Sequence, residues 1–292
     1  MDMDKELHSA AEKGDLDGFY KLALVKHNAL QWDDNIVYTS TPCHVAARHG
    51  HLDFALEMLR LRPEFASTLD SKGLTPIQVA FDSGKVEMVL NLLNYDPEMV
   101  HVPSKQRKTI LHSVSESEKH AHLLYRILSV ACPNSVMDVT IRNETALHLA
   151  AKHRVFNNFN MLLSHLMKYG DKSKQARDLI NSKDIDGNTV LHIAVRENQT
   201  QMVELLLKMS NIKANLTNND NLAALYLLPS SCDFQLASIL AAAKTTYGLS
   251  IPYINLDVRC TRFSHTMSWW HCIWLYLVHL CSTKSSPLLK RN

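Results

Sequence analysis

The chain has 292 residues, 46% of them hydrophobic and 21% charged, and its formal net charge is +2. This is the balance of an ordinary globular protein with ample apolar material for a core. A charge this close to neutral argues against a dedicated nucleic-acid surface, which would be clearly basic, so we expect no nucleic-acid partner.

Cysteine usage and the first residues point to an intracellular protein. The six cysteines are scattered, and no two of them form a C-x-x-C pair, which is typical of a reducing compartment. Residues 1–6, MDMDKE, are polar and acidic, so they do not resemble a secretory signal. We therefore expect the protein in the cytoplasm or at the cytoplasmic side of the plasma membrane.

A short pattern recurs along the chain from its beginning. Residues 7–16 read LHSAAEKGDL, and residues 43–52 read CHVAARHGHL. Later copies align on a threonine, with steps of 34, 34, 36 and 44 residues, and Ala223 is the next equivalent position after another 34. About seven units are therefore predicted over residues 4–245. The aligned threonines are Thr41, Thr75, Thr109, Thr145 and Thr189.

The copy around Thr189 shows what each unit is expected to form. Asp186-Gly187 is a turn signal, and the Thr189 hydroxyl can cap the helix that follows. Apolar residues at helical spacing from Leu191 share one face, and Asn198 stands where this first helix must end. Residues 202–207 make a second, mostly apolar helix. Because two such short helices cannot bury their own apolar faces, they need neighbours, as in a stacked repeat.

These copies resemble ankyrin repeats, which have a period near 33 residues, a Thr-Pro-Leu-His-x-Ala motif and a glycine that ends the first helix. The matching stretches read TPCHVAA, TPIQVA, TILH, TALHLAA and TVLHIA. The resemblance implies an all-α solenoid of about seven helix-turn-helix units with short β-turn hairpins, in residues 1–246. It also implies that Thr and His side chains tie adjacent repeats together. The matching residues are Thr41, His44, Thr75, Thr109, His112, Thr145, His148, Thr189 and His192.

Proline recurs after the second helix of repeats two to four, at Pro63, Pro97 and Pro133. Because proline cannot continue a helix, it fixes the exit. Together with a charged insertion at residues 168–178, this feature is similar to the plant ankyrin proteins of the accelerated-cell-death type, which carry a C-terminal PGG membrane domain. The resemblance implies innate-immune, defence or stress signalling at a plant membrane. The PGG motif and its membrane spans are missing or truncated in this chain.

Some segments depart from the repeat pattern. Residues 1–30 are predicted to form a first, capping repeat, and residues 32–38 an extended link. Residues 115–118, SESE, and Arg154 stand where glycine should close the first helix. Residues 221–228 lack both the threonine and the histidine. This end is therefore expected to be looser or to serve as the C-terminal cap.

The repeat fades towards the C-terminus. Residues 247–266 are predicted to be a linker, and residues 267–292 a Trp-rich apolar tail with a basic end. As a helix, residues 267–281 would span only about 22 Å, against about 30 Å of hydrocarbon, which disfavours a single span. A membrane-surface or hairpin-like anchor and a protein-docking tail both stay open. The membrane-contact candidates are Trp269, Trp270, Ile273, Trp274 and Leu277.

The sixteen histidines predict neither a metal site nor catalysis. Four of them recur at one position of the repeat, so a structural role explains them. Cysteines and histidines between residues 260 and 281 match no common zinc spacing, so we expect no metal. There is no glycine-rich phosphate loop and no G-x-S-x-G motif. We therefore expect no cofactor, no small-molecule substrate and no enzymatic activity.

What remains is a surface for proteins. In ankyrin-like stacks the turn tips and the first-helix faces line a concave groove. The tips run from basic in the middle repeats to acidic and neutral later, an arrangement that would orient an acidic partner segment on the early repeats. The competing interpretation is that tips are polar because they face water. The candidates are Ser71, Lys72, Lys105, Gln106, Arg107, Lys108, Arg142, Asn143, Asp184, Asp186, Asn218 and Asn219, with Glu116, Glu118 and Lys119 as a second set.

The sequence thus predicts a non-catalytic scaffold or adaptor that binds proteins, in signal transduction. The alternative is a membrane-integrated ankyrin signalling protein, anchored by the C-terminal apolar segment. A transcriptional cofactor is disfavoured, because Lys290-Arg291 is too short for a basic localisation run.

Overall fold

The structure, a computed structural model, describes residues 2–25, 40–130, 133–170, 178–229 and 234–247. These residues fall within the first of the two units into which the chain divides, Met1–Leu249. The link predicted at residues 32–38 and nearly all of the predicted linker lie outside the described residues. So does the tail with its five membrane-contact candidates, Trp269, Trp270, Ile273, Trp274 and Leu277.

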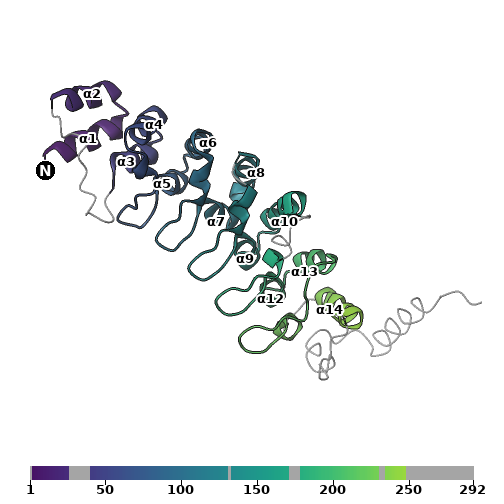
Figure 1. Cartoon of the computed structure of the whole chain (residues 1–292). Coiled ribbons are helices and arrows are strands. Elements are labelled where there is room, and N and C mark those ends of the chain that lie inside the picture. The colour runs from purple at the N-terminus through teal and green to yellow at the C-terminus, as the bar shows by residue number, and fades with distance from the viewer. Residues whose placement is uncertain (1, 26–39, 131–132, 171–177, 230–233, 248–292) are drawn as a thin grey trace, which may run out of the picture. The chain divides into compact units, whose positions relative to one another are not determined.

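Helices follow one another in pairs along the chain (Figure 1). Within the described residues the β contacts amount to one isolated bridge, between Thr217 and Ala223. The predicted all-helical class is therefore confirmed. The pairs are α1 (Asp2–Lys13) with α2 (Leu16–Val25), α3 (Pro42–His49) with α4 (Leu52–Leu61), α5 (Pro76–Asp82) with α6 (Val86–Tyr95), α7 (Ile110–Ser115) with α8 (Ala121–Val130), α9 (Ala146–Lys152) with α10 (Phe156–Gly170), α12 (Val190–Arg196) with α13 (Thr200–Leu207), and the 3₁₀ helix η5 (Ala224–Leu227) with α14 (Phe234–Tyr247).

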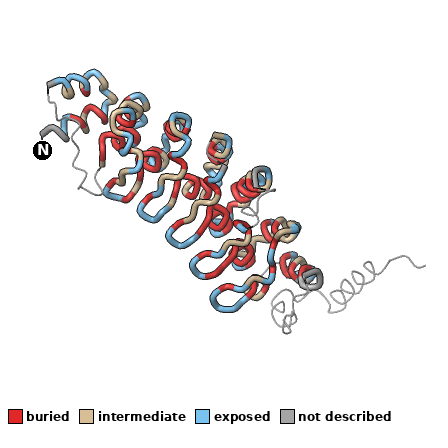
Figure 2. Tube along the Cα trace, in the orientation of Figure 1, coloured by how far each residue is buried: buried red, intermediate tan, exposed pale blue. Residues whose placement is uncertain are grey.

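Each pair packs on the next, and this produces two layers (Figure 1). In one layer α1 contacts α3, α3 contacts α5, and the series continues through α7, α9 and α12 to η5. In the other layer α4, α6, α8, α10, α13 and α14 contact one another in that order. Buried residues concentrate where helices face one another, whereas the loops between pairs carry many exposed residues (Figure 2). The apolar face that a pair cannot bury alone is thus covered by its neighbours.

The first helix of each pair begins where the threonine pattern predicts it. Five aligned threonines are the N-cap residues of α3, α5, α7, α9 and α12. The side chain three residues later, His or Gln, reaches back to the N-cap, which forms a capping box. Pro42 and Pro76 occupy the first helical turn, where a missing N–H leaves no bond unmade. Ala223, which lacks both partners, precedes only the short η5.

A residue just beyond the first helix has a left-handed backbone in five of the repeats. Its φ is +69° at Gly14, +84° at Gly50, +72° at Gly84, +62° at Arg154 and +56° at Asn198. Arg154 therefore takes the conformation that the repeat pattern assigns to glycine, although a side chain makes it less favourable.

In three repeats the second helix is followed by a short 3₁₀ helix that begins at the recurring proline. These 3₁₀ helices are η1 (Pro63–Ala66), η2 (Pro97–His101) and η4 (Pro133–Met137). The helix α10 extends to Gly170, so the beginning of the predicted insertion at residues 168–178 continues this helix. Residues 171–177 of the insertion lie outside the described residues.

Candidate protein-binding surface

Five loops that connect one repeat to the next share one conformation, and we call them the tip loops (Figure 1). In each of them the N–H of the first residue donates to the carbonyl oxygen of the fifth, with N–O distances of 2.8–3.0 Å. The fourth residue has φ between +55° and +78°, which glycine and asparagine adopt most easily. The tip loops comprise residues 70–74, 104–108, 140–144, 184–188 and 218–222.

The side chain of the first residue holds the turn together in most tip loops. The carboxylate of Asp70 accepts from the N–H groups of Lys72 and Leu74, at 2.9 and 3.0 Å. Asp184 does the same at 2.7 and 3.0 Å, and Asn218 at 3.0 Å for both bonds. These side chains form the local turns that Asp and Asn favour.

Two of the predicted contact residues have buried side chains. Asp184 is only 9% exposed and Asn218 only 7% exposed. Both side chains accept from backbone N–H groups of their own loops, and the Asn218 amide also donates to the side-chain oxygen of Asn188 in the preceding loop, at 3.2 Å. They shape the surface without presenting a side chain on it.

Neighbouring tip loops are joined through their backbones, so each loop is positioned by the next one. One N–H of every later loop donates to a carbonyl of the loop before it. Backbone hydrogen bonds of this kind fix the relative register of two segments. The pairs are Lys105 to Gly73 at 2.9 Å, Ile141 to Gln106 at 3.1 Å, Ile185 to Arg142 at 2.8 Å and Asn219 to Asp186 at 3.1 Å.

Most of the predicted tip side chains face solvent. Lys108 is an intermediate case, because it is half-buried and its ammonium lies 2.7 Å from a carboxylate oxygen of Glu116. The exposed candidates are Ser71, Lys72, Lys105, Gln106, Arg107, Arg142, Asn143, Asp186 and Asn219.

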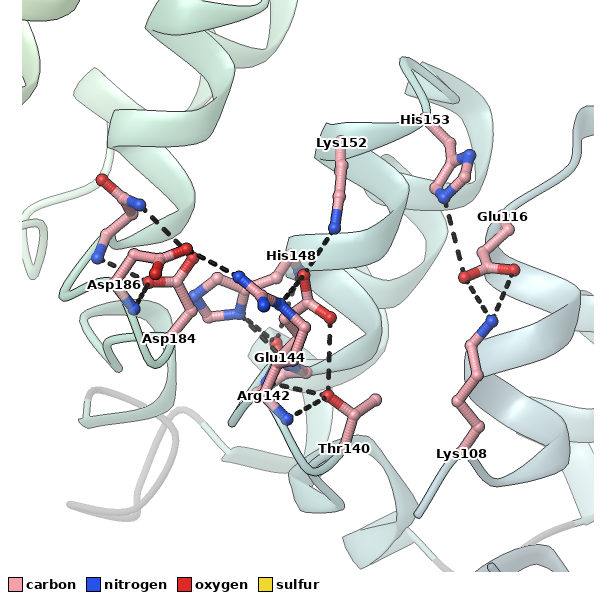
Figure 3. A network of polar contacts seen from close by, with 12 residues as sticks. Lys108, Glu116, Thr140, Arg142, Glu144, His148, Lys152, His153, Asp184 and Asp186 are labelled. Atoms are coloured by element: carbon pink, nitrogen blue, oxygen red, sulfur yellow. Dashed lines mark hydrogen bonds and ion pairs between the residues drawn. The ribbon is translucent and has the colours of Figure 1, made fainter. Parts of the chain in front are cut away.

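A network of ion pairs lies around the middle tip loops (Figure 3). Glu144, whose side chain is 8% exposed, lies 2.8 Å from the Lys152 ammonium and 3.9 Å from the Arg142 guanidinium. Arg142 also lies 2.7 Å from the carboxylate of Asp186 in the next tip loop. Since the charges here are paired, the middle of the row presents little net charge.

Two exposed aliphatic residues of the tip loops are not among the predicted contact residues. Ile141 is 58% exposed and Ile185 is 56% exposed. They occupy the second position of neighbouring tip loops, where the other loops carry serine, lysine and asparagine. The signal that reveals them is the alignment of the loops by position, because an isolated isoleucine in a repeat usually indicates core.

Two of the recurring histidines, His44 and His192, link repeats from inside the stack, whereas the buried Nε2 atoms of His112 and His148 have no hydrogen-bond partner among the described residues. In His44 and His192 the Nδ1 atom accepts from the N–H of the N-cap threonine, at 3.1 and 3.2 Å. The Nε2–H then donates to the carbonyl of the next tip loop, Leu74 at 3.0 Å and Leu222 at 3.1 Å. Burial lowers the pKa of His44 and of His112 to about 4. The neutral ring is thus the form that these sites hold.

The irregular third repeat is closed by a residue from the fourth. The Asn158 side chain on α10 is fully buried, and its amide donates to the carbonyls of Val114, Ser115 and Ser117, at 3.0–3.3 Å. These carbonyls lie at the end of α7, where the pattern lacks glycine. A side-chain donor from the neighbouring repeat takes over the role of a C-cap.

Other chemistry is not visible in the described ranges. No group of three or more His, Cys, Asp or Glu residues there is arranged to hold a metal ion. None of the helices in the described part of the chain combines the length and apolarity that crossing a membrane requires. Cys43 is a free, buried thiol, and burial raises its pKa to about 12.

A sequence profile of ankyrin repeats matches residues 7–101 and 111–220. The chain belongs to the ankyrin repeat family. This match confirms the predicted fold. The capping boxes and the tip loops are the parts of each repeat that recur in this structure. The ankyrin repeat domain of Bcl-3 has a similar structure, with a TM-score of 0.56 and 21% sequence identity, over 72% of this chain and 87% of that one. At this identity the likeness shows the fold alone.

Relatives of this ankyrin repeat chain occur in plants and animals. An ankyrin repeat-containing protein of Arabidopsis thaliana, BDA1, is 33% identical over 234 residues, which are 77% of this chain and 53% of that protein. Inversin of Mus musculus is 25% identical over 62% of this chain and 16% of its own length. The chain thus spans about half of the plant relative and a small part of inversin. Ankyrin repeats are generally protein–protein interaction modules.

Proposed function

We propose that this protein is a non-catalytic adaptor that binds a partner protein along its tip loops. The observation that carries the proposal is the continuous row of backbone hydrogen bonds from loop 70–74 to loop 218–222. Such a row holds exposed side chains from five repeats in a fixed order, and a pre-organised surface loses less entropy on binding. Its exposed charges also change along the row, which favours one orientation of a charged partner.

A capture experiment with matched variants tests this proposal. The full-length chain would be immobilised and exposed to native extract beside the double variant Lys105→Glu/Arg107→Glu. The control would reverse a charge on a second helix, Glu204→Lys, away from the tip loops. Proteins held by the wild type and the control but lost from the tip variant support the adaptor function. Proteins held equally by the tip variant and lost from the control would place the binding surface elsewhere.

The proposal includes plant defence or stress signalling as the process served. Two observations support it, namely the 33% identity to an Arabidopsis ankyrin repeat protein and the proline after the second helix. The recurring proline is the feature on which the resemblance to the accelerated-cell-death type of plant ankyrin protein rests. An intracellular location fits the free, buried thiol of Cys43.

Membrane attachment through residues 267–281 is a second candidate function. It is favoured by the Trp-rich composition of that segment and by the basic residues on both sides of it. Flotation with vesicles tests it, with the full chain compared to a version that ends at Thr246. A full chain that alone floats, through salt and carbonate washes, supports an anchor. Two versions that both stay at the bottom would exclude it.

A further inference from the structure

Two exposed isoleucines lie next to each other on the row of tip loops. Ile141 and Ile185 occupy the second position of loops 140–144 and 184–188, and each is more than half exposed. The N–H of Ile185 donates to the carbonyl of Arg142 at 2.8 Å, which holds the two loops together. The loops on either side carry lysine and asparagine at this position. Ile141 and Ile185 thus form an aliphatic patch that is two repeats wide.

The polar side chains around the aliphatic patch are already bonded to a neighbouring repeat. They hold the loops together, and a bond to a partner would have to replace one that exists. The two isoleucines, in contrast, gain free energy by leaving water. The bonds are Arg142 to the carboxylate of Asp186 at 2.7 Å, Asn143 to the carbonyl of Lys183, the Lys183 ammonium to the carbonyl of Thr217, and Asn219 to the carbonyl of Ile185 at 3.0 Å.

The backbone of the row favours a helix over a strand as the partner. A strand that joins another by pairing needs backbone groups that are still unpaired. The N–H groups of Ile141, Ile185 and Asn219 are each already bonded to the loop before. A helix satisfies its own backbone and presents only side chains, and side chains are what an aliphatic patch can bind.

The spacing of the repeats matches two turns of a helix. Packed helices lie about 8–10 Å apart, so equivalent residues of adjacent repeats, such as Ile141 and Ile185, are separated by roughly one such step. Residues i and i+7 of a helix share one face and are about 10.5 Å apart along its axis. A residue at i+4 lies between them, over the gap between the two isoleucines.

We propose that the aliphatic patch binds an amphipathic helix of a partner protein, which lies along the row with apolar residues at i, i+4 and i+7. This inference rests on the proposed adaptor function and names the kind of partner. The residues at i and i+7 contact Ile141 and Ile185, and polar residues follow where the row becomes polar. Because Arg142 and Asp186 beside the patch are paired, apolar burial holds the helix and salt has little effect on its binding.

Three synthetic peptides of one length test the proposal. The striped peptide is a lactam-bridged helix with leucines at i, i+4 and i+7 and polar residues elsewhere. The scrambled peptide has the same composition and bridge, with the leucines spread around the helix. The third keeps the leucine positions of the striped peptide but replaces two polar residues by proline, which prevents a helix.

Each peptide is labelled with fluorescein and titrated with the full-length chain, and its anisotropy is measured at low and at high salt. The striped peptide should bind about tenfold or more tightly than either of the others. Its affinity should change by less than about twofold with salt, because no unpaired charge is needed for its binding.

Variants of the chain test whether the aliphatic patch is the contact. Ile141→Ser/Ile185→Ser should weaken binding of the striped peptide about tenfold or more, and each single change should weaken it in part. Leu24→Ser is the matched control, because it removes an exposed aliphatic side chain on α2, outside the row. It should bind as the wild type does, and circular dichroism melts would show that all variants are folded.

Sedimentation velocity of the full-length chain tests a second copy as the competing occupant. The inference expects no self-association that depends on the isoleucines. Dimers that Ile141→Ser/Ile185→Ser abolishes would place a second copy on the aliphatic patch and overturn the inference.

Equal affinity for the striped and scrambled peptides, tighter binding of the proline peptide, or wild-type affinity in the double isoleucine variant would also overturn it, and so would the absence of binding to the wild type. The capture experiment separates this failure from that of the adaptor function. If proteins are still lost from the tip variant while the striped peptide does not bind, the tip loops remain the binding surface and the helical partner is wrong.

Discussion

At the scale of single residues, each recurring histidine makes bonds that only its neutral ring can make. Nδ1 of His44 accepts from a backbone N–H, so it carries no proton, and Nε2–H donates to Leu74 of the next tip loop. A second proton would abolish the acceptor and place a charge in the core. The same geometry recurs at His192.

This geometry predicts a pH dependence of stability. The folded pKa of His44, about 4, lies below its ordinary value of 6.5, so the unfolded chain binds the proton more readily. The stabilising contribution is complete above pH 6.5 and is lost as the pH falls from 6.5 towards 4. Urea unfolding at several pH values should show this loss, which is about 3 kcal/mol for His44 alone.

The variant His44→Gln should flatten that pH dependence. Gln78 occupies the same position in the next repeat, where its amide oxygen accepts from Thr75 N–H at 3.1 Å and its NH₂ donates to Lys108 at 2.6 Å. Glutamine can therefore replace both bonds without titrating. The exposed His122→Gln is the control and should leave the pH profile unchanged. A His44→Gln profile identical to the wild type would contradict this account of the histidine.

Asn158 is the residue on which the irregular third repeat depends. Asn158→Ala removes the donor to three carbonyls at the end of α7 and should cost about 1–3 kcal/mol of unfolding free energy. Asn160→Ala, an exposed asparagine on the same helix, corrects for helix propensity and should change it by less than about 0.5 kcal/mol. Equal losses in the two variants would show that Asn158 is not a cap.

At the scale of elements, glycine is required where two tip loops approach closely. Gly187 has φ +77°, and a Cβ there would lie 2.6 Å from the backbone nitrogen of Asn219 and 2.4 Å from its side-chain oxygen. Gly84 has nearly the same φ, +72°, but a Cβ there would meet nothing within 4 Å. Gly187→Ala should therefore destabilise by more than Gly84→Ala, which costs only the left-handed strain of about 1 kcal/mol. Thermal melts of the two variants compare them directly, and equal losses would mean that the loops do not touch.

The packing between repeats predicts the cost of core truncation. Leu191 on α12 and Leu206 on α13 are each 1% exposed, and each faces a neighbouring repeat. Replacing either leucine by alanine should cost about 2–5 kcal/mol. Leu24→Ala, at a residue that is 78% exposed, is the control with nearly no cost. A loss below about 0.5 kcal/mol for Leu191→Ala would contradict the repeat register.

Some of these local structures could be predicted from the sequence, and others could not. The threonine spacing predicted every N-cap from Thr41 to Thr189, because a capping box is a local interaction with a local signature. Asn158 could not be predicted, since it caps a helix more than forty residues away. The inward Asp184 and the outward Ile141 were missed for a related reason. Residue type predicts average exposure, whereas the direction of a side chain depends on the hydrogen bonds of its own loop.

At the scale of the whole molecule, one rule explains both stability and binding. Each helix pair is stable only against its neighbours, so every tip loop is positioned by the stack behind it and by the loop beside it. Glu144 is paired with Lys152 and Arg142 in its own repeat, and Arg142 is paired with Asp186 of the next tip loop. A partner that contacts several tip loops would therefore meet their side chains in the fixed order of the repeats.

Site-specific photo-crosslinking tests this claim most directly. Benzoylphenylalanine would replace Ser71, Ile141 or Ile185 on the tip loops, or Tyr125, which is 65% exposed on α8. Each full-length variant would be irradiated in native extract, and adducts would be identified by mass spectrometry. If the tip loops bind the partner, the tip variants should crosslink to the same protein, and the Tyr125 variant should not crosslink to it. A partner that crosslinks only through Tyr125 would show that the tip loops are not the binding surface.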